Sequence, residues 1–185
     1  MADFQHGGNF QTGQAFQRKA HNLGLLEKEM GGYVTKSYPD FILKMPKRDW
    51  PIYGERALSL LREAKAVLAP KYGLDLKRPV LVEFFGAQSD FAIRTFGALG
   101  GQGMLGVCFG TVVTMNSPGS LANGRNNWES TLWHEFCHVI TLSVTKNRMP
   151  RWLSEGISVY EERQRDTAWG MRMNEDFRRI ILEDG

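Results

Sequence analysis

The sequence has no run of about twenty apolar residues, the length that a membrane-spanning helix needs. It also lacks a basic segment followed by an apolar stretch and a small-residue cleavage site, the pattern of a secretory signal. We therefore expect the chain as given to be soluble and cytoplasmic, with no membrane partner. An excised domain could have left a signal behind.

Neither sign of charge dominates, since 23 lysines and arginines stand against 20 aspartates and glutamates, a net charge of +3. This excess provides no electrostatic basis for binding nucleic acid, so we expect no such partner. Cysteine is scarce: Cys108 and Cys137 alone do not make a disulfide framework, and Cys137 is expected to be a buried, reduced thiol.

Histidine is also scarce, yet two of the four histidines lie close together in the segment T-L-W-H-E-F-C-H-V-I, residues 131–140. His134 and His138 are four residues apart, so on a helix they share a face and can bind one ion together. Glu135 is rotated away from that face, within reach of a water on the metal. This is the arrangement that a zinc hydrolase needs.

A second helical segment, R-W-L-S-E-G-I-S-V-Y-E-E, covers residues 151–162 and follows Pro150, which suits a first helical turn. Its apolar residues recur at helical spacing: Trp152, Leu153, Ile157 and Tyr160. Glu155 lies between apolar neighbours, where a carboxylate is costly unless a positive group meets it. A zinc ion would do so; the alternative is a surface ion pair with Arg151, four residues earlier.

Together, H-E-F-C-H and W-L-S-E-G-I-S-V-Y-E-E resemble the gluzincin metallopeptidases, most of all the peptidase MA-like domains and the aminopeptidase branch. The resemblance implies one Zn²⁺ per chain, held by His134, His138 and Glu155, with Glu135 as the general base. Ser154 stands where the aminopeptidase branch has asparagine.

Glu162 matches an acidic position of the same branch and is the candidate partner of a ligand histidine. The alternative for Glu162 is a solvated surface carboxylate beside Glu161.

The resemblance also implies an α+β, zincin-like fold. In that fold a small mixed sheet, with an antiparallel edge strand, packs on the active-site helix and on further helices. Substrate pairing along the edge strand would then fall to residues 111–114. These are Thr111, Val112, Val113 and Thr114.

Two regions are expected. Residues 33–185 form the gluzincin-like metallopeptidase domain, and residues 1–32 form a flexible lead and a helix. That helix could be the last of an upstream helical repeat, although one helix does not establish a repeat. His6 and His21 have no partner at ligand spacing and are expected to be solvated.

Periodicity and turn residues predict the remaining elements. We expect strands over residues 38–45, 79–85, 105–109 and 111–116, with the strand at 79–85 in the middle of the sheet. We expect helices from Asp49 to Pro70, over 89–96, after an Asn127 cap, and over 167–182. The glycine-rich stretch at 97–106 is a flexible lip over a cleft or a plain connecting loop. The last helix packs on the core or covers the cleft.

The sequence thus predicts a zinc-dependent peptidase that hydrolyses peptide or protein substrates with a metal-activated water and Glu135. The aminopeptidase motif G-x-M-E-N is absent from residues 110–114, which favours an endopeptidase. No tyrosine or histidine between His138 and Glu155 supplies an oxyanion donor. The alternatives are a catalytically weak, zinc-stabilised peptide-binding or scaffold module, and a plain α/β domain without metal.

Overall fold

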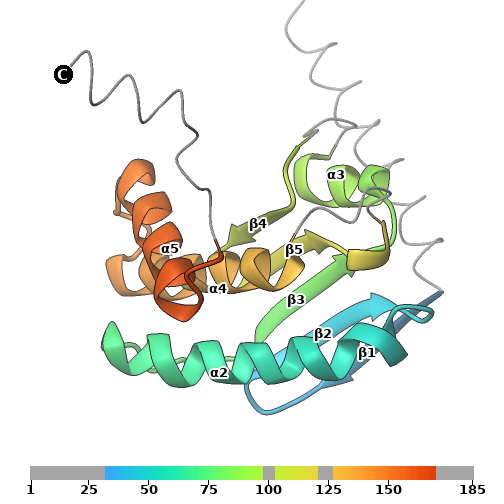
Figure 1. Ribbon diagram of the computed structural model, residues 1–185, viewed down its shortest axis with the longest axis horizontal. Helices are drawn as coiled ribbons and strands as arrows, with labels where there is room; N and C mark the ends of the chain where they lie inside the picture. Colours follow the sequence, from blue (N-terminus) through green and yellow to red (C-terminus); the bar gives the residue numbers. More distant parts are fainter. Residues whose placement is uncertain (1–31, 98–102, 121–126, 170–185) are drawn as a thin grey trace, which may run out of the picture.

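The computed structural model describes residues 32–97, 103–120 and 127–169. These residues form a five-stranded mixed sheet and four α-helices (Figure 1), which confirms the α+β class. None of the helices in these ranges is long and apolar enough to cross a membrane. The predicted N-terminal helix, with His6 and His21, and most of the predicted C-terminal helix lie outside the described residues.

The strand order is β1-β2-β3-β5-β4. Strand β1 (Tyr33–Ser37) is antiparallel to β2 (Phe41–Pro46), which is parallel to β3 (Val80–Phe85). Strand β3 is parallel to β5 (Val112–Asn116), and β5 is antiparallel to β4 (Gly106–Phe109). The central place predicted for residues 79–85 is confirmed. The single strand predicted over 38–45 begins instead at Phe41, because residues 38–40 form the turn between β1 and β2.

The predicted edge strand is wrong in its residues. Thr111 lies in the turn before β5, and Val112, Val113 and Thr114 lie inside the sheet, where β5 pairs with β3 on one side and β4 on the other. The backbone groups of these residues are therefore occupied. The antiparallel edge strand beside helix α4 (Trp128–Thr145) is β4.

Helices cover both faces of the sheet, following the alternation of side chains along β3. Val80, Val82 and Phe84 face the main core, which contains the apolar residues of α2 (Glu55–Lys71) and α4. Glu83 and Phe85 face the opposite side, where α3 (Gln88–Phe96) packs. Figure 1 shows α3 at one end of the sheet, away from α2.

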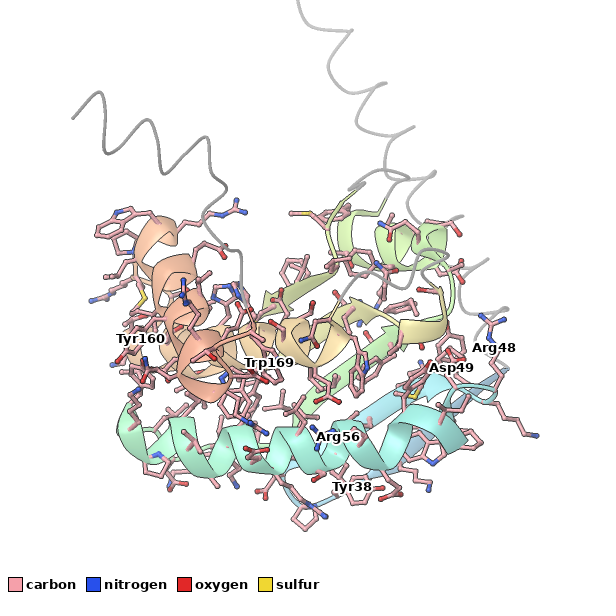
Figure 2. All side chains as sticks on the ribbon, in the orientation of Figure 1. Tyr38, Arg48, Asp49, Arg56, Tyr160 and Trp169 are labelled. Atoms are coloured by element: carbon pink, nitrogen blue, oxygen red, sulfur yellow. The ribbon has the colours of Figure 1, made fainter. Side chains whose placement is uncertain are left out.

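The predicted cap at Asp49 is absent. Asp49 precedes a π-helical turn, η2 (Trp50–Gly54), and makes no side-chain cap. Its buried carboxylate (labelled in Figure 2) accepts instead a hydrogen bond of 2.5 Å from the Ser117 hydroxyl, because the end of β5 comes close to it. Helix α2 then continues through Pro70 to Lys71.

The predicted cap of α4 is confirmed, because the Asn127 side chain accepts from the backbone N–H groups of Glu129 and Ser130, each at 3.2 Å. Helix α5 (Arg151–Arg165) follows and packs against α4. The helix predicted over residues 151–162 is confirmed and its Ile157 packs on the core, but Trp152 is 74% exposed and Tyr160 53%. The buried face of α5 is polar and consists of Ser154, Ser158, Glu161 and Glu162.

Candidate metal centre

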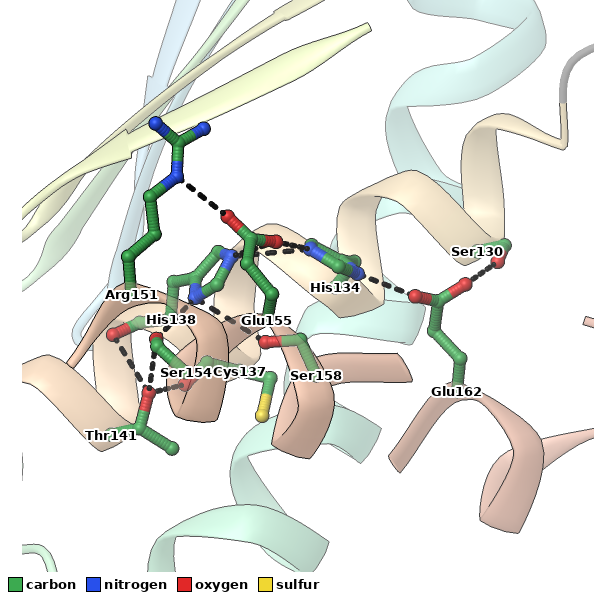
Figure 3. A network of polar contacts seen from close by, with 10 residues as sticks. All are labelled: Ser130, His134, Cys137, His138, Thr141, Arg151, Ser154, Glu155, Ser158 and Glu162. Carbon is green, nitrogen blue, oxygen red and sulfur yellow. Dashed lines mark hydrogen bonds and ion pairs between the residues drawn. The ribbon is translucent and has the colours of Figure 1, made fainter. Parts of the chain in front are cut away.

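Three donor atoms from two helices converge at the junction of α4 and α5 (Figure 3). The Nε2 atoms of His134 and His138 are 3.1 Å apart, and Oε2 of Glu155 lies 3.1 Å from the first and 3.4 Å from the second. Ligand atoms at about 2.0–2.1 Å from a tetrahedral zinc ion are themselves about 3.3 Å apart. The three residues therefore fit a metal ion; the separations alone do not identify which ion.

Glu162 orients His134. Its Oε1 accepts from Nδ1 of His134 at 2.5 Å, and the Ser130 hydroxyl donates to its other oxygen. A proton on Nδ1 leaves the lone pair of Nε2 for the cluster, as outer partners of metal ligands usually arrange. Burial lowers the pKa of His134, but the surrounding carboxylates of Glu162, Glu135 and Glu155 together outweigh burial, and the pKa lies above its ordinary value. Glu162 is buried, so it is not the solvated carboxylate of the alternative.

His138 is held by hydroxyl groups instead of a carboxylate. Its Nδ1 lies 2.8 Å from Oγ of Ser154 and 3.3 Å from Oγ of Ser158, both buried. Burial and the neighbouring His134 hold the pKa of His138 below its ordinary value. A neutral imidazole with its Nδ1 proton directed at Ser154 is the form that binds a metal through Nε2. Ser154, the departure from the aminopeptidase motif, thus orients the second histidine.

Glu155 makes both contacts that the sequence left as alternatives. Its Oε2 faces the two histidines, and its Oε1 lies 3.5 Å from Nε of Arg151. Burial raises the pKa of Glu155, but His138, His134 and Arg151 outweigh it, so the pKa lies below its ordinary value. The ion pair with Arg151 therefore coexists with the cluster and leaves one carboxylate oxygen free for it.

Glu135 stands beside the cluster without joining it. The side chain is 8% exposed, and burial raises its pKa to about 7, although the neighbouring His134 lowers it. A carboxyl group with a pKa near neutrality both accepts and returns a proton readily. Proton transfer is the role that the sequence predicts for this residue.

Two hollows meet at the cluster, and both include Gly106, Glu135 and Glu155 in their walls. The Met104 hollow, about 620 Å³, is bounded by α3, β4 and the start of α5. Its apolar wall consists of Phe96, Met104, Val107, Phe109, Leu142 and Met149. The Trp169 hollow, about 770 Å³, extends along the first turns of α4 towards Glu162 and Trp169. The two hollows form a cleft that passes over Glu135 beside β4.

Gly106 allows β4 to approach α4. A Cβ atom at this position would lie 2.8 Å from Cγ of Glu135 and 3.1 Å from a methyl group of Thr131. Real contacts of this kind are longer, so the strand would move or the Glu135 side chain would turn. A glycine within a strand pattern is the sequence signal for such close approach, and it was not used in the predictions above.

We expect Gly106→Ala to displace Glu135 and to lower the free energy of unfolding by about 1–3 kcal/mol, the usual cost of overpacking. Chemical denaturation measures the change. Gly156→Ala in α5 is the matched control, since nothing lies within 4 Å of a Cβ atom there and alanine favours a helix. Equal stability of the two variants would show that β4 has room beside Glu135.

Reasoning from the sequence did not identify Gly106 or Ser158 as parts of the site, nor the place of Arg151 in the wall of the Met104 hollow. It also assigned no contact to Ser154. These residues act through contacts between elements, which local spacing does not encode.

No family model matches the chain, and no curated protein or solved structure matches it either.

Proposed function

We propose that the chain is a zinc-dependent peptidase, most similar in plan to the gluzincins, that cleaves peptide bonds within an extended chain. The observation that carries this proposal is the convergence of two imidazole nitrogens and one carboxylate oxygen beside a buried glutamate, at the base of an open cleft. The zincin-like fold is part of the proposal, and it is supported by the two helices that supply the donors and by the edge strand β4.

The donor set supports zinc as the ion. Two neutral imidazoles and one carboxylate are the protein ligands of many catalytic zinc sites, which leave one coordination position open. Zinc in such a site acts as a Lewis acid on a carbonyl oxygen and lowers the pKa of water. The Glu162 carboxylate accepts from Nδ1 of His134, and the Ser154 hydroxyl is placed to accept from Nδ1 of His138, an arrangement that leaves both Nε2 lone pairs for the ion.

Glu135 supplies the proton transfers. We assign it the acceptance of a proton from the attacking water and the return of that proton to the amine of the leaving peptide. Strand β4 supports substrate positioning, because an extended peptide can pair with the free edge of a sheet. The cleft continues on both sides of Glu135, which favours cleavage inside a chain over removal of a terminal residue.

A second candidate is a zinc-stabilised peptide-binding or scaffold module with little turnover. One observation favours it: within the described residues, no tyrosine and no third histidine lines either hollow. Loss of one oxyanion donor typically costs about a hundred- to a thousandfold in turnover.

Metal analysis and blocked peptides separate the candidates. We expect the purified chain to contain one zinc ion and to cleave peptides blocked at both ends, and a chelator to abolish cleavage until zinc is restored. Magnesium, which prefers oxygen ligands, should not restore activity. A chain that keeps its zinc but cuts no blocked peptide is the binding module, and a chain without metal refutes both candidates.

A further inference from the structure

Among the described residues that line the cleft, one positively charged side chain, that of Arg151, has no role in the site as described so far. Peptide hydrolysis places negative charge on the former carbonyl oxygen, and active sites stabilise that charge with donors already in place. The chain has five tyrosines and four histidines. His134 and His138 belong to the metal cluster, and His6 and His21 lie outside the described residues.

None of the five tyrosines lines the cleft. The Tyr72 hydroxyl donates to Glu161 at 2.5 Å, and the Tyr33 hydroxyl accepts from the backbone N–H of Gly86 at 3.2 Å. The other three have aromatic or cationic neighbours elsewhere: Tyr38 beside Arg62, Tyr53 beside Trp128, and Tyr160 beside Lys71. Figure 2 places Tyr160 near one end of α2, in agreement with its contact to Lys71.

Arg151, unlike the tyrosines, lies in the wall of the cleft. It lines the Met104 hollow together with Glu135, His138 and Glu155. Its Nε lies 3.5 Å from Oε1 of Glu155, whose other oxygen faces the two histidines. The guanidinium extends past Glu155, and its two terminal nitrogens have no partner among the described residues (Figure 3). The Arg151 side chain is 83% exposed, so the ion pair with Glu155 leaves the guanidinium beside the cluster with its terminal donors open to solvent and substrate.

We propose that Arg151 is a catalytic residue, whose terminal N–H groups donate to the carbonyl oxygen of the scissile peptide as that oxygen becomes negative. The proposal rests on the peptidase function proposed above. A guanidinium suits this role because it stays charged at all relevant pH values and presents several donors in one plane.

The step balances as a hydrolysis. Water loses one proton to Glu135 and forms a bond from its oxygen to the carbonyl carbon, while the carbonyl π pair moves to the oxygen that Arg151 contacts. The pair then re-forms the double bond, the C–N bond breaks, and the leaving nitrogen takes the proton from Glu135. The products are a carboxylic acid and an amine, and no oxidant or other reactant is needed.

Substitution of Arg151 tests the role. In Arg151→Met we expect kcat for a blocked peptide to fall by about a hundred- to a thousandfold with little change in KM, as for other lost oxyanion donors. Arg151→Lys should lose less of its kcat than Arg151→Met does. Guanidinium ion at concentrations too low to denature should restore part of kcat in Arg151→Ala. Arg148→Met is the matched control, because Arg148 is exposed and lines neither hollow. Its kcat should equal that of the wild type.

Zinc affinity is measured in parallel, because Arg151 also contacts Glu155. If excess zinc restores full kcat to Arg151→Met, the arginine only positions the metal ligand, and the proposal is wrong. It is equally wrong if the loss is confined to peptides that carry a carboxylate, since Arg151 then binds substrate, or if kcat does not change.

Binding of a tetrahedral anion tests the role of Arg151 without a measurement of turnover. We expect a phosphinic peptide, which imitates the tetrahedral species, to bind Arg151→Met about a hundred- to a thousandfold more weakly than the wild type, in proportion to the loss of kcat. The parent peptide should bind both proteins equally well. A wild-type chain that cuts nothing refutes the peptidase, and equal affinity of both proteins for the phosphinic peptide refutes the role of Arg151.

Discussion

Replacement of Glu155 by glutamine is expected to strip the metal from the chain at chelator concentrations that leave the wild type loaded. Glu155 contributes one of the three convergent donor atoms and the only negative charge among them. A neutral amide keeps the shape of the side chain but removes that charge, so the loss reflects coordination instead of packing. Competition with a chromogenic chelator measures the affinity, and the melting temperature with and without zinc provides a second readout.

A graded series makes this prediction specific. Glu162→Gln should lower zinc affinity by only about 10–100-fold, the usual cost of losing an outer partner of a ligand histidine. Glu55→Gln should change nothing, because the Glu55 side chain is 77% exposed and lies on α2. The loss of zinc affinity in Glu155→Gln must be larger than the loss in Glu162→Gln. If Glu155→Gln binds zinc as tightly as the wild type, the third ligand is another group.

The convergence of His134 and His138 could be predicted from sequence because helical geometry converts a spacing of four residues directly into proximity. No local rule places Glu155 beside them. It lies on a different helix, and the prediction depended on resemblance to a family motif. The contact between Glu162 and His134 depended on the same resemblance, whereas Ser158 had no signal because a buried serine resembles any other serine in sequence.

The order of the strands could not be predicted, because strand pairing joins distant segments. Residues 106–109 and 112–116 form a hairpin around Gly110, whose φ of +61° suits a tight turn. Either strand of that hairpin could lie at the edge. The choice depends on β3, which takes β5 as its parallel neighbour and leaves β4 outside.

Helix α5 shows why periodicity failed at the site itself. Apolar residues at helical spacing normally mark the buried face. In α5 the buried face is polar because it supplies the partner of each histidine and Glu161, which pairs with Lys71 at 2.6 Å. Trp152 and Tyr160 are displaced to the exposed face. The polar contacts of the cluster thus override the rule that apolar residues form the buried face, although the same residues predict the helix correctly.

Replacement of Glu135 by glutamine is expected to abolish cleavage while the chain keeps its metal. Glutamine has the size of glutamate but cannot carry the proton, and general-base catalysis contributes about a hundred- to a ten-thousandfold in rate. Glu135 is not among the three convergent donors, so zinc content should not change. Glu129→Gln is the matched control on the same helix, where Glu129 pairs with Arg56 away from the cluster. Cleavage by Glu135→Gln at the wild-type rate would exclude Glu135 as the base.

Stability of the metal-free protein gives Glu135→Gln a second readout. Burial raises the pKa of Glu135 from 4.5 to about 7, so the folded chain binds more protons than the unfolded chain between these values. The contribution of this carboxyl group to stability is therefore present in full below the lower value and is lost as the pH rises towards the higher one. In the presence of chelator, the melting temperature of the variant should increase relative to that of the wild type as the pH rises through this window. A gain that is the same at every pH would mean that the Glu135 carboxyl group titrates alike in the folded and unfolded chains.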